Sequence, residues 1–204
     1  MHRRYALLLA VFLVVVLGAC TNSTEDLGRK LEVAAYDGNL DGVRQALAAG
    51  ADPNEPSASG GMLGEDPPIC VAAAGIQRSA SGKDGTAIVK ELLEAGAQVD
   101  ARTPSGWTAL IRVANSNNDE VVDLLIEAGA DVNAQAEDGK TALMGAAYIG
   151  NAQIAERLLE AGADPDLENV NGRTAYSQAK HHDHSAVMEL LRPTGRAGND
   201  GAEQ

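Results

Sequence analysis

A sequence motif that begins with Thr108-Ala-Leu and ends with Glu127-Ala-Gly-Ala-Asp-Val-Asn133 occurs twice in the chain. The second copy begins with Thr141-Ala-Leu and ends with Glu160-Ala-Gly-Ala-Asp-Pro-Asp166. Each residue of the first stretch is separated from its counterpart in the second by 33 positions. An internal period of about 33 residues with this content is typical of repeats that each hold a β-turn and two helices. The sequence therefore predicts an array of stacked repeats, because one such repeat cannot bury its apolar face alone.

The composition also favours closely packed helices. Hydrophobic residues make up 45% of the 204 residues, whereas aromatic residues make up only 3%. A core of Ala, Leu and Val suits small antiparallel helices better than a β-sandwich, because strands are enriched in aromatic and β-branched residues. The repeat further favours one elongated domain over two separate ones.

The repeated pattern resembles the ankyrin-repeat family, whose repeats carry a Thr-x-Leu start and a Gly-Ala-Asp-Val-Asn end. The resemblance extends over about residues 25–192. It implies an all-α ankyrin-repeat solenoid of about five helix-turn-helix repeats with short β-turn hairpin tips, forming an elongated single domain. The repeats are expected at about residues 25–54, 55–101, 102–134, 135–167 and 168–192.

Left-handed backbone is expected at two places in each regular repeat. Gly129 and Gly162 follow the second helices, where glycine commonly ends a helix. Gly150 lies between the two helices of its repeat. Asn117 takes the equivalent place one repeat earlier, and Asn also tolerates a positive φ.

The second repeat is longer than the others, because Gly50 and Gly96 are 46 residues apart. The additional residues lie in a Gly/Ser/Pro-rich loop at 55–68 and in a segment at 77–85 between the two helices. Loops of this length are often functional, but they are equally compatible with tolerated insertions. Cys70 of this repeat is expected to be a small buried hydrophobe and not a reactive thiol.

The first 19 residues have the features of an export signal. Arg3 and Arg4 precede an unbroken apolar run at 6–17. At about 1.5 Å per residue this run is too short to span a hydrocarbon core of about 30 Å, so we interpret it as a signal peptide. Its ending, Leu17-Gly-Ala-Cys20, resembles the lipobox of bacterial lipoproteins, in which the Cys becomes the acylated N-terminus. The alternative is ordinary secretion with an incidental Cys20.

The lipobox resemblance implies a signal peptide at 1–19 and a lipidated Cys20 with a short tether at 20–24. Because Thr21 and not Asp follows the cysteine, we expect an exported, membrane-anchored lipoprotein that faces the periplasm from the outer membrane. Membrane contact is then through the lipid anchor only. The polar, Gly-rich tail at 193–204 is expected to be disordered.

Net charge limits the direct partners of the folded surface. The formal charge is −13, and it becomes −15 when residues 1–19 are removed. Such a surface disfavours nucleic acid and anionic bilayers, because both are polyanions. It is compatible with a basic protein partner, and equally with a surface selected for solubility. We expect a monomer that carries no cofactor.

The sequence shows no constellation of catalytic residues, so we expect a protein that is not an enzyme. No Ser/His/Asp set, Gly-rich phosphate loop or separated cysteine pair occurs. His181-His182-Asp183-His184 is the only cluster of metal-ligand residue types. Neighbouring histidines on a helix point to different sides, so we interpret the cluster as a polar turn. A weak surface metal site is the alternative.

The family resemblance implies a binding surface in place of an active site. In ankyrin-repeat proteins the hairpin tips and the exposed ends of the first helices line a concave face that binds other proteins. Carried over by position, this face consists of Arg102, Pro104, Ser105, Trp107, Asn115, Ser116, Glu137, Asp138, Lys140, Tyr148, Ile149, Val170, Asn171, Arg173, His181 and His182.

Trp107 is the only Trp of the chain and stands at a position that is normally exposed in the family. With Tyr148 and Ile149 it is expected to form an apolar spot among polar neighbours, as in a binding hot spot. Alternatively, Trp107 folds down onto its own hairpin.

We therefore interpret the chain as a non-catalytic protein–protein interaction module at the bacterial envelope, which serves a periplasmic protein as scaffold or stabilising partner. A first alternative is an immunity protein or inhibitor of a toxin or hydrolase delivered to the periplasm. A second alternative, of a different class, is an envelope-structural role.

Overall fold

The computed structural model describes residues 26–56, 65–76 and 83–192. Its contacts divide the chain into two compact halves, residues 1–104 and 105–204, which are described separately. The described residues form helices and turns without any strand, which confirms the expected all-α repeat fold. The predicted signal peptide, lipidated cysteine and disordered tail lie outside the described residues, as do 57–64 and 77–82 within the two predicted insertions.

The N-terminal half contains a helix over residues 26–36, followed by α2 (Leu40–Ala48), α3 (Pro68–Ile76) and α4 (Lys83–Glu94). Both α2 and α3 pack against α4. Arg44 of α2 donates two hydrogen bonds, of 2.9 and 2.7 Å, to Glu91 Oε1 of α4. Cys70 is fully buried in α3, as expected for a small hydrophobe.

The second insertion is shorter than predicted, because α4 already begins at Lys83. The sequence placed the segment between the helices at 77–85, yet its last residues belong to the first turn of α4. Gly85 of this first turn lies close to α3, since a Cβ at this position would overlap the side chain of Ile76. Glycine therefore lets the two helices approach closely where a larger residue would separate them.

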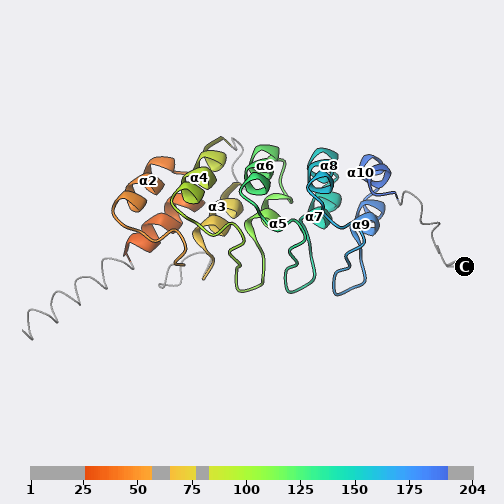
Figure 1. Cartoon of the computed structure of the whole chain (residues 1–204), viewed down its shortest axis with the longest axis horizontal. Coiled ribbons are helices and arrows are strands. Elements are labelled where there is room, and N and C mark those ends of the chain that lie inside the picture. Colours follow the sequence, from red (N-terminus) through yellow and green to blue (C-terminus); the bar gives the residue numbers. More distant parts are fainter. Residues whose placement is uncertain (1–25, 57–64, 77–82, 193–204) are drawn as a thin grey trace, which may run out of the picture. The chain divides into compact units, whose positions relative to one another are not determined.

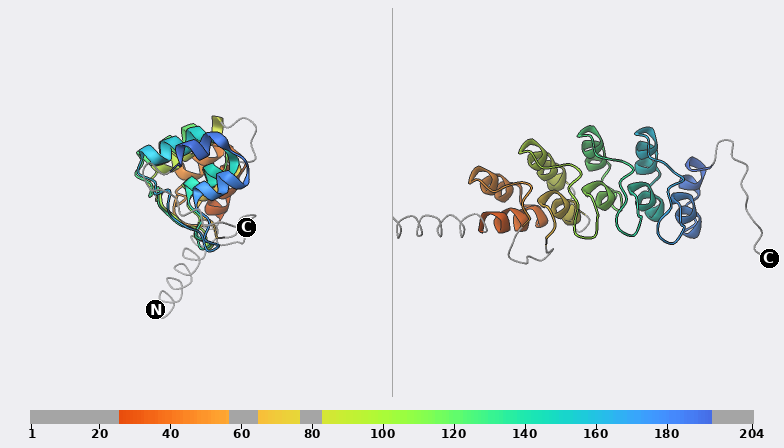
Figure 2. Two further views of the ribbon diagram at one scale, coloured as in Figure 1. Left: turned by 90° about the vertical axis from the view of Figure 1, so that its right-hand side faces the viewer. Right: turned by 60° about the horizontal axis from the view of Figure 1, so that its bottom comes forward.

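The described residues of the C-terminal half, 105–192, form three helix pairs. They are α5 (Ala109–Val113) with α6 (Asp119–Glu127), α7 (Ala142–Ile149) with α8 (Ala152–Glu160), and α9 (Ala175–His181) with α10 (Ser185–Leu190). Helix α7 packs against α5 and α9, and α8 packs against α6 and α10, so first and second helices form two layers (Figure 1 and Figure 2). Leu110 and Leu143 of the first layer and Leu125 and Leu158 of the second are almost completely buried.

A threonine cap begins each first helix of the C-terminal half. The hydroxyl of Thr108 accepts the backbone N–H three residues on at 3.3 Å, and those of Thr141 and Thr174 do the same at 3.2 and 3.3 Å. Such a cap satisfies one of the N–H groups that a helix leaves unpaired at its start. The Thr-Ala start quoted above is therefore the start signal of each helix pair.

Asparagine side chains join consecutive repeats in the turns that follow the second helices. Asn133 Nδ2 donates to the Gly162 carbonyl at 3.1 Å, and its Oδ1 accepts the Asp164 N–H at 2.8 Å. Asn54 makes the same pair of bonds to the following repeat in the N-terminal half. Where the repeated motif ends in Asn, at Asn54 and Asn133, this side chain thus connects the repeat to the next one.

The left-handed glycines predicted after the second helices are confirmed. Gly129 and Gly162 have φ values of 86° and 92°, and Gly150 between α7 and α8 has 84°. The prediction for Asn117 is wrong, because Asn117 has no positive φ. Helix α5 ends early, at Val113, and backbone bonds of the i→i+3 type then carry the chain toward α6 without a left-handed residue.

The hairpin tips of the C-terminal half are bonded to one another through the backbone. The Glu137 N–H donates to the Ser105 carbonyl at 3.1 Å, and the Val170 N–H donates to the Asp138 carbonyl at 3.0 Å. The two donors, Glu137 and Val170, are 33 positions apart, and so are the two acceptors, Ser105 and Asp138. The same bond therefore recurs from one tip to the next. The tips therefore form a row beside the layer of first helices (Figure 1).

Glycine is required inside these tips for two reasons at once. Gly106 and Gly139 have φ values of 77° and 76°, which disfavour any residue with a Cβ. A Cβ at Gly106 would also lie 3.0 Å from the Glu137 nitrogen, and one at Gly139 would lie 2.7 Å from the Asn169 Cα. The close approach of neighbouring tips thus depends on these glycines.

We expect Gly139→Ala to destabilise the protein more than Gly162→Ala. Both positions have a positive φ, so each Ala costs about 1–2 kcal/mol of backbone strain. Only at Gly139 does the new Cβ also meet the next tip, which adds about 1 kcal/mol or more of overpacking. Urea unfolding of the two variants measures the difference, and equal losses would show that the approach of the tips is no constraint.

Candidate functional site

Trp107, Lys140 and Tyr148 form an aromatic–lysine cluster where the hairpin tips meet the first helices of the C-terminal half. Trp107 and Lys140 each stand directly before a capping threonine, at equivalent positions of consecutive repeats. The Lys140 Nζ lies 5.1 Å from the centroid of the Trp107 ring and 5.5 Å from that of Tyr148. The ammonium is thus held near two aromatic rings, within the range of cation–π attraction.

Trp107 is half-buried, so the expectation of an exposed Trp is met only in part. Its ring packs against Ile111 of α5 and against Ala134 and Ala136. The two alanines belong to the following hairpin, so the ring does not simply fold onto its own hairpin either. Their small side chains leave room for the Trp ring between neighbouring repeats, and this packing fixes the ring beneath Lys140.

Lys140 is a cation that is partly removed from water. Burial lowers the pKa of Lys140 from its ordinary value, and the nearby carboxylate of Asp138 opposes part of this shift. An ammonium group has three N–H donors. Within the part of the chain that the structure describes, the Lys140 Nζ forms neither a hydrogen bond nor an ion pair. Its donors are therefore left to solvent or to a ligand.

Histidine rings continue the cluster from Tyr148 to the end of α9. The His182 ring meets the Tyr148 ring edge-on, with centroids 4.5 Å apart, and the His181 ring meets His182 at 4.9 Å. His184 stacks on His182 at 6.0 Å, and its Nε2 lies 3.0 Å from the Tyr148 carbonyl. Because a carbonyl can only accept, His184 donates this bond from Nε2–H.

The turn between α9 and α10 places these rings. Asp183, 33 positions after Gly150, has a φ of 58° and is the one non-glycine residue with a positive φ among those described. Gly150 makes room for the ring of His184, which a Cβ at that position would overlap. His184 can therefore reach the end of α7 and hold its ring against the Tyr148 backbone.

The structure brings five of the predicted surface residues into one continuous group of rings and cations: Trp107, Lys140, Tyr148, His181 and His182. Sequence reasoning missed His184, which it considered only as a metal ligand. His184 takes the N-cap position that Asn fills at the starts of α6 and α8, but it makes no cap hydrogen bond. In the repeat pattern, a histidine at a position where the other repeats have a capping Asn could have identified His184 as unusual.

The other predicted residues lie outside this group. Asn115 Nδ2 donates to the Ile111 carbonyl at 2.9 Å, and Ser116 Oγ donates to the Val113 carbonyl at 2.6 Å, so both side chains serve to end α5. Ile149 is half-buried. The exposed residues are Ser105, Glu137, Asp138, Val170, Asn171 and Arg173 in the C-terminal half, and Arg102 and Pro104 in the N-terminal half.

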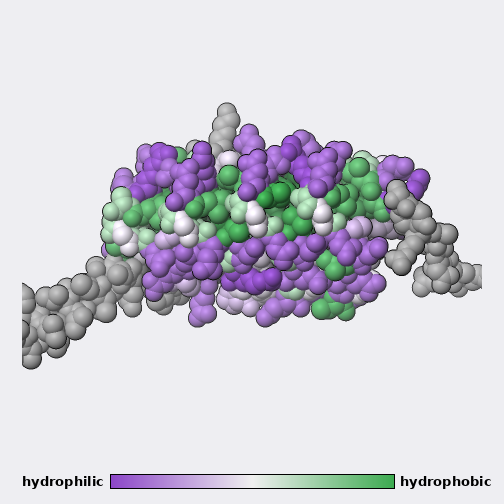
Figure 3. Space-filling model, in the orientation of Figure 1, coloured by the Kyte–Doolittle hydropathy of each residue, from purple (hydrophilic) through white to green (hydrophobic). Residues whose placement is uncertain are grey.

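The row of tips is mainly hydrophilic, as the space-filling view indicates (Figure 3). Val170 is the clearest exception, because its side chain sits at a tip and is 70% exposed. The tips thus offer polar contacts around one apolar side chain, next to the ring cluster on the first helices.

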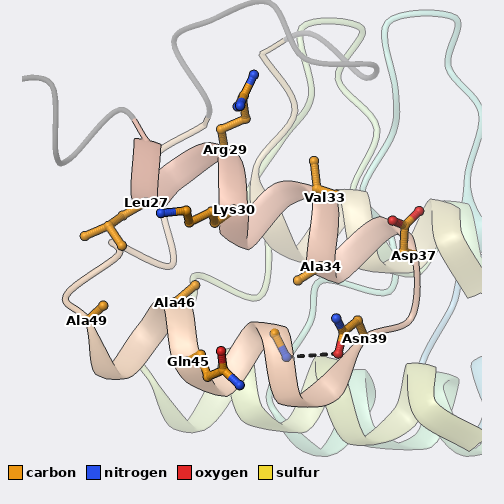
Figure 4. A pocket seen from close by; sticks show the side chains of 11 residues that line it. Leu27, Arg29, Lys30, Val33, Ala34, Asp37, Asn39, Gln45, Ala46 and Ala49 are labelled. Carbon is orange, nitrogen blue, oxygen red and sulfur yellow. Dashed lines mark hydrogen bonds between the residues drawn. The ribbon is translucent and has the colours of Figure 1, made fainter.

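A cavity of about 720 Å³ lies in the N-terminal half, between helix 26–36 and α2 (Figure 4). Leu27, Ala46 and Ala49 are among its apolar lining residues. Lys30 at its edge is paired with Asp26 at 2.6 Å. The sequence did not predict this cavity, and its lining residues form no recognisable catalytic set.

The part of the chain that the structure describes contains neither a candidate metal site nor a candidate membrane-spanning helix. No group of three His, Cys, Asp or Glu side chains is arranged to hold a metal ion, the histidines of the last repeat included. In the same residues, no helix combines the length and apolar character that crossing a membrane requires.

The comparison with protein families agrees with this geometry. The family model of ankyrin repeats (3 copies) matches residues 31–136, 76–169 and 133–201. The chain belongs to the ankyrin-repeat family. Among curated proteins, none matches the sequence. Ankyrin repeats in general are protein–protein interaction modules, and ankyrin-repeat proteins are generally not catalysts.

We expect Asp138→Asn to lower the pKa of Lys140 further. The Asp138 carboxylate raises this pKa against the effect of burial, so removing its charge leaves burial unopposed. Asn keeps the Oδ1 that accepts the Lys140 backbone N–H at 3.0 Å, so the tip keeps its geometry. NMR titration of the lysine Cε signals measures the shift, with Lys90 of α4 as internal control. If the pKa of Lys140 is the same in the variant and the wild type, the Asp138 carboxylate does not act on the Lys140 ammonium in this way.

Proposed function

We propose that this ankyrin-repeat protein acts by binding another protein through its C-terminal half and catalyses no reaction. The observation that carries the proposal is the ring cluster, in which Trp107, Lys140 and Tyr148 hold one another in place. Aromatic side chains that are already fixed lose little conformational freedom on binding, which is why they serve as interface anchors. Tyr148 is 49% exposed and offers one face to a partner.

We also propose that the protein is exported and held at the cell envelope through Cys20. Support comes from the sequence alone, namely the apolar run at 6–17 and the Leu17-Gly-Ala-Cys20 ending. Multiple acyl chains on one residue give stable anchoring, where a single chain gives only marginal anchoring. The partner would then be a periplasmic protein, which the ankyrin repeats serve as scaffold or stabilising partner.

A second candidate role is that of an immunity protein or inhibitor against a toxin or hydrolase delivered to the periplasm. The net charge of −13 favours it, because an acidic surface attracts a basic protein and speeds their encounter. Both roles use the same surface and differ in whether the bound partner stays active. An activity assay of the captured partner, with and without the ankyrin-repeat protein, separates them.

We expect Tyr148→Ala to weaken partner binding about tenfold or more, because hot-spot aromatics contribute about 2 kcal/mol or more to binding. Thermal unfolding should change little, since exposed side chains contribute little to stability. The measurement is affinity capture from cell-envelope extract with the full chain as bait. Leu190→Ala, which truncates an exposed apolar residue of α10, is the matched control. Trp107 is left intact because it packs against Ile111.

A protein enriched by the wild type and by Leu190→Ala, but not by Tyr148→Ala, would be the partner. If Tyr148→Ala captures it equally well, the binding surface lies elsewhere in the chain, and the proposal for the C-terminal half fails.

We expect Cys20→Ser to abolish lipid attachment and to move the protein from the membrane fraction to the soluble envelope fraction. The reason is that the lipobox-like ending places the lipid at residue 20, and serine offers no thiol for this attachment. Metabolic labelling with a fatty-acid analogue, followed by fractionation, measures both effects, and Cys70→Ser serves as control. Unchanged labelling of Cys20→Ser would overturn the lipoprotein assignment.

A further inference from the structure

The binding surface carries cations that the protein itself does not neutralise. In the C-terminal half, Arg157 pairs with Asp123 and Arg192 pairs with Glu189. Lys140, by contrast, forms no ion pair with any described residue, and the same holds for Arg173 and Lys180. Arg173 stands at the position equivalent to Lys140 in the next repeat. A chain with a net charge of −13 thus leaves unpaired positive charge on the surface that we assign to binding.

Hydrogen-bond donors are also left over around Lys140. Besides the ammonium group, the Tyr148 hydroxyl and the ring nitrogens of His181 and His182 make no hydrogen bond within the described residues. The acidic residue of the same tip, Asp138, already accepts the Lys140 backbone N–H and forms no ion pair with the ammonium. The site therefore offers several hydrogen-bond donors around one half-buried cation, and no described side chain forms an ion pair with that cation.

We propose that this site receives the carboxylate of an Asp or Glu side chain of the partner protein, with the Lys140 ammonium as its counter-ion. The inference rests on the proposed function and names the chemistry of that same surface. A carboxylate carries the opposite charge and can accept several hydrogen bonds, so it would pair with the Lys140 ammonium and with the neighbouring donors at once. The Trp107 and Tyr148 rings then contact the apolar residues that flank the acid.

The surrounding charge makes this contact selective. An acidic protein surface repels acidic partners as a whole, because like charges approach at a cost. A partner that is basic overall is attracted by the negative charge of this protein. If it also presents one acidic side chain, that side chain can form an ion pair with Lys140. Discrimination of this kind, with one attractive contact in a repulsive field, is a common source of specificity.

The test is a selection of random displayed peptides against the full chain, with Tyr148→Ala used to remove peptides that bind elsewhere. We expect the selected peptides to be enriched in Asp or Glu next to apolar residues. Exchanging the acid of a selected peptide for its amide should raise its Kd about tenfold or more, as for other charge-assisted contacts at interfaces.

Three lysine variants then show whether Lys140 is the counter-ion. Against Lys140→Met, which keeps the aliphatic stem between the rings, the acid and amide peptides should bind equally well. Lys140→Arg keeps the charge and should preserve the difference. Lys90→Met, in α4 of the other half, is the matched control and should also preserve it. Circular dichroism of each variant shows that the helices remain.

The outcomes separate the two proposals. Peptides that depend on Tyr148 but show no excess of acidic residues, or an acid–amide difference that survives Lys140→Met, would overturn the carboxylate inference and leave the binding function standing. Peptides that bind Tyr148→Ala as tightly as wild type, or a selection that yields no binder, would overturn both.

Discussion

The backbone hydrogen bond between neighbouring hairpin tips is the contact on which the C-terminal half depends. It joins the Ser105 carbonyl to the Glu137 N–H and recurs one repeat later. The bond forms only because Gly106 and Gly139 allow both a left-handed turn and a close approach. Since Lys140 follows Gly139 directly, the same turn that brings the tips together also places the ammonium near the Trp107 and Tyr148 rings. The tips are therefore a structural element that also supports the proposed binding surface.

Most of the fold could be predicted because its signals are local and repeated. The hydroxyl of each capping threonine accepts the backbone N–H three residues on, and each glycine that ends a second helix acts through its own φ, so the spacing of these residues is enough to place the helices. The prediction for Asn117 failed because a left-handed residue is only one way to leave a helix, and α5 ends early with i→i+3 bonds. Helix α4 begins earlier than expected, and Gly85 in its first turn packs closely on Ile76, a tertiary contact that the local pattern does not contain.

The candidate site was predictable by position but not by contact. Register placed Trp107, Lys140 and Tyr148 on one surface, and the structure brings these side chains together. Register says nothing of side-chain direction, however, so it could not show that Trp107 packs against the alanines of the next hairpin. It also could not show that Asn115 turns back to its own helix. Family position therefore defines a list of candidates, and packing between repeats selects among them.

The last tip of the array still has the features of an internal one. The Asn171 carbonyl stands at the position of the Ser105 carbonyl, and Gly172 has a φ of 69°. A Cβ at Gly172 would come no closer than 3.9 Å to another atom, the Glu168 Oε2, whereas one at Gly106 would meet the following tip. The tip of an additional repeat of 33 residues could therefore form the same backbone bond to the tip at Asn171 that the existing tips form with one another. Gene duplication can therefore lengthen the array by whole repeats without redesigning the existing ones. In evolution, the size of the proposed binding surface can therefore change with the number of repeats.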